Sequence, residues 1–138
     1  MKHLVKENKL ADHIFVDSAG TMDYHIGEPA DARMRSHASN RGYNLDSIAR
    51  QFDPDKDFAE FDYIVAMDNE NYADLLSFDI KNKYSTKIYR MAQFCEKIGI
   101  KEVPDPYYGG PQGFEFVLDI LEDGCNGLLE KIRQDIHQ

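Results

Sequence analysis

The sequence has few cysteines, few positive charges and no long hydrophobic run, and each shortage excludes a class of protein. Its 138 residues include 16 Lys and Arg against 25 Asp and Glu, for a net charge of −9. Such an acidic balance argues against a nucleic-acid-binding surface and against adhesion to an anionic membrane. It also means that any phosphate site must supply its own local positive field.

No apolar stretch approaches the roughly 20 residues of a transmembrane helix, so we expect no membrane partner. The two cysteines, Cys95 and Cys125, are too few for a disulfide framework and fit the reducing conditions of a cytoplasmic protein. The five histidines show no metal-ligand spacing, so we expect neither a metal site nor another cofactor.

Apolar runs and amphipathic segments alternate along the chain, with no internal repeat and no linker that would divide it. Short strands are expected at residues 14–16, 63–67 and 87–89, and helices at residues 1–8, 31–41, 68–76, 92–98 and 114–136. This order predicts one domain of the α/β class, with a parallel sheet flanked by helices. Gly124 and Gly127 lie inside the last helix and cost about 1 kcal/mol each against alanine, so we expect a kink or break there.

The most informative segment is residues 103–110, Val-Pro-Asp-Pro-Tyr-Tyr-Gly-Gly. Prolines on both sides of Asp105 fix the backbone and donate no N–H, so this carboxyl sits on a stiff loop rather than in a helix or central strand. A rigid carboxyl beside Tyr107 and Tyr108 suits proton transfer next to a bound aromatic ring. The alternative is a surface turn between two elements, because Pro, Asp and Gly are common turn residues.

Several fragments of the sequence occur in a recognisable order. They are residues 16–21 (Val-Asp-Ser-Ala-Gly-Thr), Tyr24, residues 27–33 (Gly-Glu-Pro-Ala-Asp-Ala-Arg), residues 49–51 (Ala-Arg-Gln), residues 61–68 (Phe-Asp-Tyr-Ile-Val-Ala-Met-Asp), residues 103–108 and residues 128–131 (Leu-Leu-Glu-Lys). Together they resemble the low molecular weight protein-tyrosine phosphatases. The resemblance runs from about Leu4 to Ile132.

This resemblance implies a hydrolase that cleaves phosphotyrosine, in a protein or a small aryl phosphate, through a cysteinyl-phosphate intermediate and without a metal. Asp105 matches the aspartate that protonates the phenolic leaving group and then assists the attack of water. Tyr24, Tyr107 and Tyr108 match the aromatic residues that flank the substrate ring. Ser18 matches a residue that braces the phosphate-binding loop.

The sequence departs from the family at its signature, Cys-x5-Arg-Ser/Thr, which belongs between the first strand and the first helix. The sixth residue after Cys95 is Lys101 and the sixth after Cys125 is Lys131, and both cysteines are expected in helices as core residues. We therefore interpret residues 1–138 as a single truncated domain that lacks the first strand, the phosphate loop and most of the first helix. Such a chain is expected to be inactive alone and to self-associate through exposed sheet edges.

Other interpretations stay open. Ser47 stands where the family usually has a histidine that supports the phosphate loop. Related folds act as protein-arginine phosphatases or arsenate reductases; Tyr107 and Tyr108 favour an aromatic phosphoester, and the lack of a downstream cysteine pair disfavours arsenate reduction. A non-catalytic pseudo-phosphatase could instead use Tyr24, Tyr107 and Tyr108 as an adhesive aromatic patch.

Overall fold

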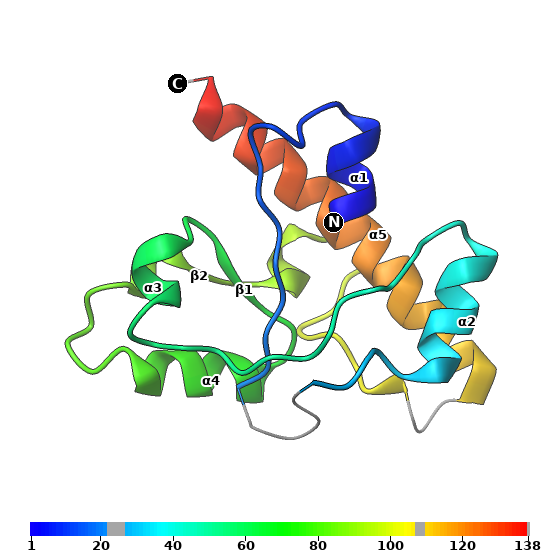
Figure 1. Cartoon of the computed structure of the whole chain (residues 1–138), viewed down its shortest axis with the longest axis horizontal. Coiled ribbons are helices and arrows are strands. Elements are labelled where there is room, and N and C mark those ends of the chain that lie inside the picture. Colours follow the sequence, from blue (N-terminus) through cyan, green and yellow to red (C-terminus); the bar gives the residue numbers. More distant parts are fainter. Residues whose placement is uncertain (22–26, 107–109, 138) are drawn as a thin grey trace.

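The computed structural model describes residues 1–21, 27–106 and 110–137. In chain order its elements are α1 (Lys2–Glu7), α2 (Ala32–Asn40), α3 (Asp57–Glu60), β1 (Ile64–Ala66), α4 (Asn69–Phe78), the 3-10 helix η1 (Ser85–Lys87), β2 (Ile88–Arg90), the 3-10 helix η2 (Met91–Phe94) and α5 (Gly110–Ile136). Figure 1 shows the strands, α3 and α4 on the left, and α5 crossing the molecule diagonally beside α1 and α2. No helix in these described ranges is both long enough and apolar enough to cross a membrane.

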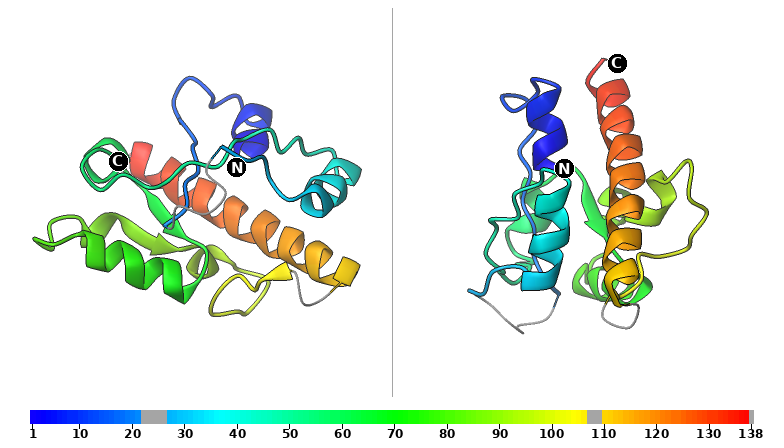
Figure 2. Two further views of the ribbon diagram at one scale, coloured as in Figure 1. Left: turned by 60° about the horizontal axis from the view of Figure 1, so that its bottom comes forward. Right: turned by 90° about the vertical axis from the view of Figure 1, so that its right-hand side faces the viewer.

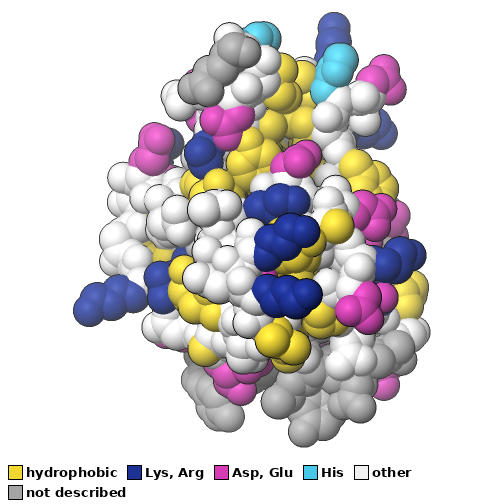
Figure 3. Space-filling model, turned by 90° about the vertical axis from the view of Figure 1, so that its left-hand side faces the viewer, with side chains coloured by type: hydrophobic (Ala, Val, Ile, Leu, Met, Phe, Trp, Pro, Cys, Tyr) yellow, Lys and Arg dark blue, Asp and Glu magenta, His cyan; other side chains and the backbone are white. Residues whose placement is uncertain are grey.

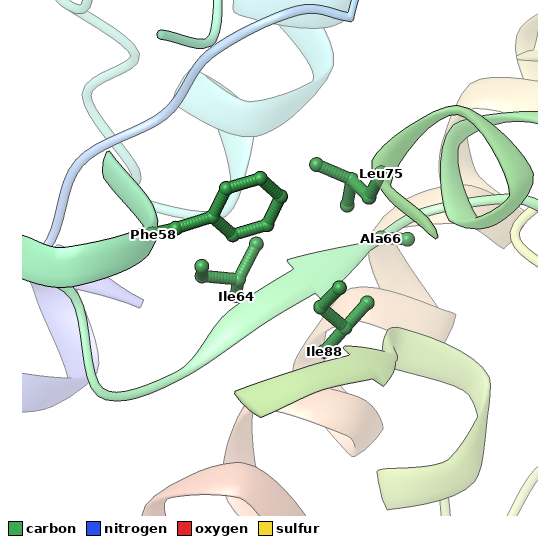
Figure 4. Packing of buried hydrophobic residues seen from close by; sticks show 5 residues of the cluster. All are labelled: Phe58, Ile64, Ala66, Leu75 and Ile88. Carbon is green, nitrogen blue, oxygen red and sulfur yellow. The ribbon is translucent and has the colours of Figure 1, made fainter. Parts of the chain in front are cut away.

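The sheet confirms the α/β class. Strands β1 and β2 pair in parallel, with Ile64 opposite Ile88, and they form the one two-stranded sheet among the described residues. One face of this sheet packs against α3 and α4. Figure 4 shows the buried side chains that meet there, which are Phe58, Ile64, Ala66, Leu75 and Ile88. The apolar run at residues 63–67 thus forms a buried parallel strand, as its composition predicts.

Two helices begin and end where their capping residues predict. The carboxylate of Asp31 accepts the backbone N–H groups of Arg33 and Met34, which opens α2. Gly42, with φ +86°, follows the end of α2 and takes a conformation that other residues rarely adopt. Asp68 opens α4 in the same way by accepting a hydrogen bond from the backbone of Asn71.

Helix α5 runs without interruption from Gly110 to Ile136, so the expected kink at Gly124 and Gly127 is wrong. Both glycines face η2, which packs closely against α5. A Cβ at Gly124 would lie 2.6 Å from the Met91 sulfur, and one at Gly127 would overlap the Phe94 carbonyl oxygen. The glycines therefore permit a close approach between two elements, and Figure 2 shows α5 as a straight rod with α1 and α2 on one side.

Two further expectations are corrected by the structure. Residues 14–16 are extended but belong to no strand, and Phe15 is 76% exposed, because a cleft separates this segment from β1. The helix expected at residues 92–98 is only η2. Beyond η2 the carboxylate of Asp123 accepts the backbone N–H groups of residues 96–98, which holds the chain in a turn.

Candidate active site

The loop that carries Asp105 is held at both ends. The backbone N–H of Val103 donates to the carbonyl oxygen of Met67, directly after β1, at 2.9 Å. At the other end Pro106 lies so close to α5 that a Cβ on Gly113 would come within 2.8 Å of the Pro106 carbonyl oxygen. Asp105 is exposed between these two contacts. Its Cα lies within about 7 Å of that of Val103, because two residues span no more.

The start of α5, which follows this loop, is fixed against α2. Arg41 forms ion pairs with Glu115, Asp119 and Glu122 on successive turns of α5. The hydrogen bond with Glu115 is the largest of several effects that raise the pKa of Arg41. Because this guanidinium stays charged, the contact fixes the beginning of α5 and, through Gly113, the end of the Asp105 loop.

A cleft of about 840 Å³ opens between residues 13–19 and β1. Ser18 lines this cleft, and its backbone N–H donates to the carboxylate of Asp17 at 2.8 Å. Met67, which anchors the Asp105 loop, lines it as well. Ser18 and the residue that anchors the Asp105 loop therefore line the same cleft.

Arg50 lines the cleft, and sequence analysis assigned it no role. Its Nε donates to Asp17 at 3.0 Å, and its terminal nitrogens donate to Asp57 at 2.8 and 3.3 Å. Among the described residues that line the cleft, it is the one arginine or lysine. The sequence did contain a signal for Arg50, because it belongs to the Ala-Arg-Gln fragment at residues 49–51. In so acidic a chain, a phosphate site is expected to have a cation beside it.

Asp57, the main partner of Arg50, is only 4% exposed. Burial by itself would raise the pKa of Asp57, but the hydrogen bonds from Arg50 and from the backbone of Asp53 outweigh it. The pKa therefore lies below its ordinary value of 3.8. Arg50, whose own pKa is raised chiefly by its hydrogen bond to Asp57, is thus balanced by two carboxylates, those of Asp57 and Asp17. It offers little free positive charge to a phosphate dianion.

The two cysteines of the chain are Cys95 and Cys125, and the surroundings of Cys95 leave it a poor nucleophile. Both are half-buried, and Cys95 lies just after η2 rather than inside a helix. Its sulfur lies 3.6 Å from the carbonyl oxygen of Ile120. Burial, followed by the charge of Asp123, raises the pKa of the Cys95 thiol. A thiol with a raised pKa is protonated near neutral pH and is a poor nucleophile.

Tyr24, Tyr107 and Tyr108 lie outside the described residues, although the chain is placed up to Thr21 and Pro106 beside them. Across residues 1–21, 27–106 and 110–137, no group of three or more His, Cys, Asp or Glu side chains is arranged to hold a metal ion. The described residues thus provide an exposed carboxyl, Asp105, on an anchored loop, and a cleft that shares the anchoring residue Met67. The one arginine among the described residues that line this cleft is already paired with two carboxylates, so it is not a free cation for a phosphate.

Comparison with known proteins identifies the family. The family model described as "Low molecular weight phosphotyrosine protein phosphatase" matches residues 1–138. A relative from Synechocystis is 45% identical over 136 residues, which cover 99% of this chain and 86% of the relative. The mouse low molecular weight phosphotyrosine protein phosphatase is 34% identical, and the match covers 94% of this chain and 82% of the mouse protein.

Solved structures agree with the sequence relatives. The crystal structure of a protein tyrosine phosphatase from Entamoeba histolytica superimposes with a TM-score of 0.92 at 47% identity, covering 97% of this chain and 85% of that one. These matches leave the expected loss of the first strand and phosphate loop as a prediction. They show that the chain belongs to the low molecular weight phosphotyrosine protein phosphatase family.

Proposed function

We propose that residues 1–138 provide the proton-donating side of a phosphotyrosine phosphatase and do not hydrolyse phosphate esters by themselves. One observation carries this proposal. The Asp105 loop is anchored to β1 and α5 in a family member whose 138 residues contain no Cys-x5-Arg sequence. The nucleophile, its arginine and the phosphate-binding loop would then lie outside these residues.

The role proposed for Asp105 is proton transfer to the phenolic oxygen of the leaving tyrosine. A well-placed general acid contributes about 10²–10⁴-fold to a rate, provided that the substrate is held and a nucleophile attacks. The two prolines beside Asp105 limit the loss of freedom on binding, because the loop is already stiff. Tyr24, Tyr107 and Tyr108 would contact the aromatic ring, and Ser18 would support the phosphate-binding loop.

The proposed inactivity follows from the missing covalent step. Hydrolysis in this family needs a thiolate held in a positive field, whereas burial keeps the Cys95 thiol protonated. A phosphate dianion also needs backbone N–H groups and a free cation, whereas Arg50 is paired with Asp17 and Asp57.

The test is hydrolysis of p-nitrophenyl phosphate by the purified chain. We expect no turnover above that of buffer, and the same for a Cys95→Ser/Cys125→Ser double variant. Asp55→Ala, which removes an exposed carboxylate on another loop, is the control for Asp105→Ala. Turnover that survives loss of both cysteines and disappears only in Asp105→Ala would contradict the proposal.

A second candidate substrate is phosphoarginine. The crystal structure described as that of a Drosophila arginine phosphatase superimposes on this chain with a TM-score of 0.81 at 31% identity. Calorimetric titration with a tyrosine peptide, its phosphotyrosine form and a phosphoarginine peptide compares the candidates. Without a phosphate cradle we expect no preference for either phosphorylated peptide. A clear preference would show that these residues alone recognise the phosphoryl group, as an interaction module would.

A further inference from the structure

The segment that connects α4 to β2 is basic, although the chain as a whole is acidic. Residues 75–95 contain four Lys and Arg residues and a single acidic residue, Asp79. Three of these cations, Lys81, Lys83 and Lys87, lie within seven consecutive residues, and we call them the basic loop patch. Figure 3 looks at the side of the molecule where this segment lies. It shows Lys and Arg side chains gathered in the middle of the face, with hydrophobic side chains beside them.

The segment is held in a fixed shape by residues behind the patch. The carboxylate of Asp79, which is buried, accepts the backbone N–H groups of Lys83 and Tyr84 at 2.9 and 2.8 Å. The Tyr84 ring stacks on the buried ring of Phe58 with centroids 5.2 Å apart. The Lys87 ammonium donates to the carbonyl oxygen of Phe58 at 2.9 Å. The nearest acidic side chain is thus engaged inside the segment, and the patch is fixed against α3.

The patch lysines have no carboxylate partner among the described residues. The ammonium groups of Lys83 and Lys87 lie 5.4 and 5.3 Å from the centroid of the Tyr84 ring. No ion pair within the described part of the chain joins a patch lysine to an acidic side chain. Arg41 and Arg50, in contrast, are each paired with more than one carboxylate. The charge of the patch therefore remains available to an anion from outside the chain.

An exposed aliphatic side chain adjoins these cations. Ile80, directly before Lys81, is 91% exposed, and Leu76 near the end of α4 is 40% exposed. A partner with carboxylates alone would leave this apolar surface uncovered. Carboxylates combined with an apolar residue match both the charge and the apolar surface of this region.

The surrounding charges favour a narrow partner over a membrane or a second copy of this chain. Figure 3 shows acidic side chains around the edge of the same face. A flat anionic bilayer would meet these acidic side chains as well as the lysines, whereas a short peptide segment meets the lysines alone. Charges farther away than about 8 Å are largely screened at physiological ionic strength. Two whole copies, each with a net charge of −9, repel one another.

We propose that the basic loop patch docks an acidic segment of a partner protein, with about three Asp or Glu residues around one apolar residue. The patch ends where β2 begins. The Asp105 loop is instead anchored after the C-terminal end of β1, which runs parallel to β2. The patch thus holds a partner at the other end of the strands and leaves the Asp105 loop unoccupied. This inference rests on residues 79–87 and not on the function proposed for Asp105.

The test uses a fluorescein-labelled peptide, Gly-Glu-Glu-Leu-Glu-Asp-Gly, with the full 138-residue chain in low-salt buffer. We expect saturable binding by fluorescence anisotropy, and amide chemical-shift changes in NMR spectra that centre on residues 79–87. A peptide with Lys in place of every acidic residue should not bind. Added salt should weaken binding of the acidic peptide, because exposed ion pairs are screened.

Two double variants with the same change in net charge separate the patch from the charge of the whole chain. Lys81→Glu/Lys83→Glu should weaken binding at least about tenfold, because attraction becomes repulsion at two positions. Lys6→Glu/Lys9→Glu, at two exposed lysines in and just after α1, should change it by no more than about twofold. Ile80→Ala keeps every charge and should weaken binding about threefold. Circular dichroism checks that all three variants fold.

Three outcomes would overturn the proposal. The first is no saturable binding of the acidic peptide by a folded chain. The second is an equal loss of binding in the two double variants, which would make net charge the cause. The third is a different occupant that depends on Lys81 and Lys83. This would appear as sedimentation with phosphatidylcholine–phosphatidylserine vesicles, or as a dimer in light scattering, that the parent chain shows and Lys81→Glu/Lys83→Glu does not.

Discussion

The molecule packs very differently where η2 meets α5 and where residues 13–19 meet β1. On the α5 side, η2 approaches the helix so closely that two glycines, Gly124 and Gly127, leave no room for a methyl group. On the side of residues 13–19, a cleft of about 840 Å³ separates extended backbone from β1. Ile120 on α5 is fully buried, whereas Phe15 on the cleft wall is 76% exposed.

This contrast shows what joins the segment at residues 13–19 to the rest of the fold. Ile14 and Val16 are only partly buried, and the exposed Phe15 stacks loosely on Phe61 with ring centroids 6.0 Å apart. Arg50 instead joins Asp17 on this segment to Asp57 at the start of α3. The α5 side is thus stabilised by close apolar packing, and the cleft side by a charged hydrogen-bond network. The predictions below test that difference.

The largest effect is expected for Ile120→Ala on the tightly packed side. Removing a fully buried isoleucine leaves a cavity, and such changes cost about 2–5 kcal/mol in the free energy of unfolding. Ile80→Ala, at a residue that is 91% exposed, should stay within about 0.5 kcal/mol of the parent chain. Urea unfolding followed by circular dichroism measures both. Similar losses at the two positions would mean that Ile120 is not tightly packed.

The next effect is expected at Asp57, on the cleft side. Its pKa is lowered in the folded chain, so the unfolded chain binds more protons as the pH falls below about 4. The stability that Asp57 contributes is therefore fully present above its unfolded pKa and is lost as the pH falls through the folded pKa. Asp57→Asn should cost about 1.5–3 kcal/mol at pH 7, the range for hydrogen bonds to charged groups.

The acid-dependent part of that prediction has its own control. Urea unfolding of the parent chain at pH 7 and at pH 3 should show a larger loss of stability than the same pair of measurements on Asp57→Asn. Asp55→Asn, at an exposed residue of the same loop, should behave as the parent chain does. An unchanged pH dependence in Asp57→Asn would mean that other carboxylates govern the acid response.

A somewhat smaller loss is expected for Gly127→Ala. The new methyl group would overlap the Phe94 carbonyl oxygen, and overpacking of this kind costs about 1–3 kcal/mol. Gly99→Ala is the matched control, because a Cβ there meets nothing within 4 Å. The measurement is the midpoint of thermal unfolding. A Gly127→Ala chain as stable as the Gly99→Ala chain would show that η2 is free to move away from α5.

The smallest effect is expected for Phe15→Ala. Because this ring is already 76% exposed, its removal should change the free energy of unfolding by no more than about 0.5 kcal/mol. Urea unfolding again provides the measurement, with Ile120→Ala as the reference. A loss of several kcal/mol would mean that the ring is covered in solution, and hence that the cleft is closed or occupied.

The parts of the fold that could be predicted are those with local signals. Asp31 and Asp68 predicted the starts of α2 and α4 through side chains within three residues of the groups they bond. The glycines of α5 misled the prediction, because their role depends on Phe94, which is far from Gly127 in the sequence. The helix expected at residues 92–98 failed for the same reason, since Asp123 ends it from α5.

In the candidate site, too, features set by neighbouring residues could be predicted and features set by distant residues could not. A loop at Asp105 was predictable because the two prolines beside this residue disfavour a helix or a central strand. The pairing of Arg50 was not found, because Asp17 lies 33 positions away along the chain. A charge that is neutralised by a distant partner looks the same in the sequence as a free one. The loop at Asp105 was thus predictable from the sequence, and the pairing of Arg50 with Asp17 and Asp57 was not.

Met67 links the Asp105 loop to the cleft. Its carbonyl oxygen holds Val103, and the same residue forms part of the cleft wall. A change in the backbone position of Met67 would therefore reach the Asp105 loop through this one hydrogen bond. The cleft and the Asp105 loop thus share Met67, and hydrogen exchange at the backbone amide of Val103 would report whether that link is intact.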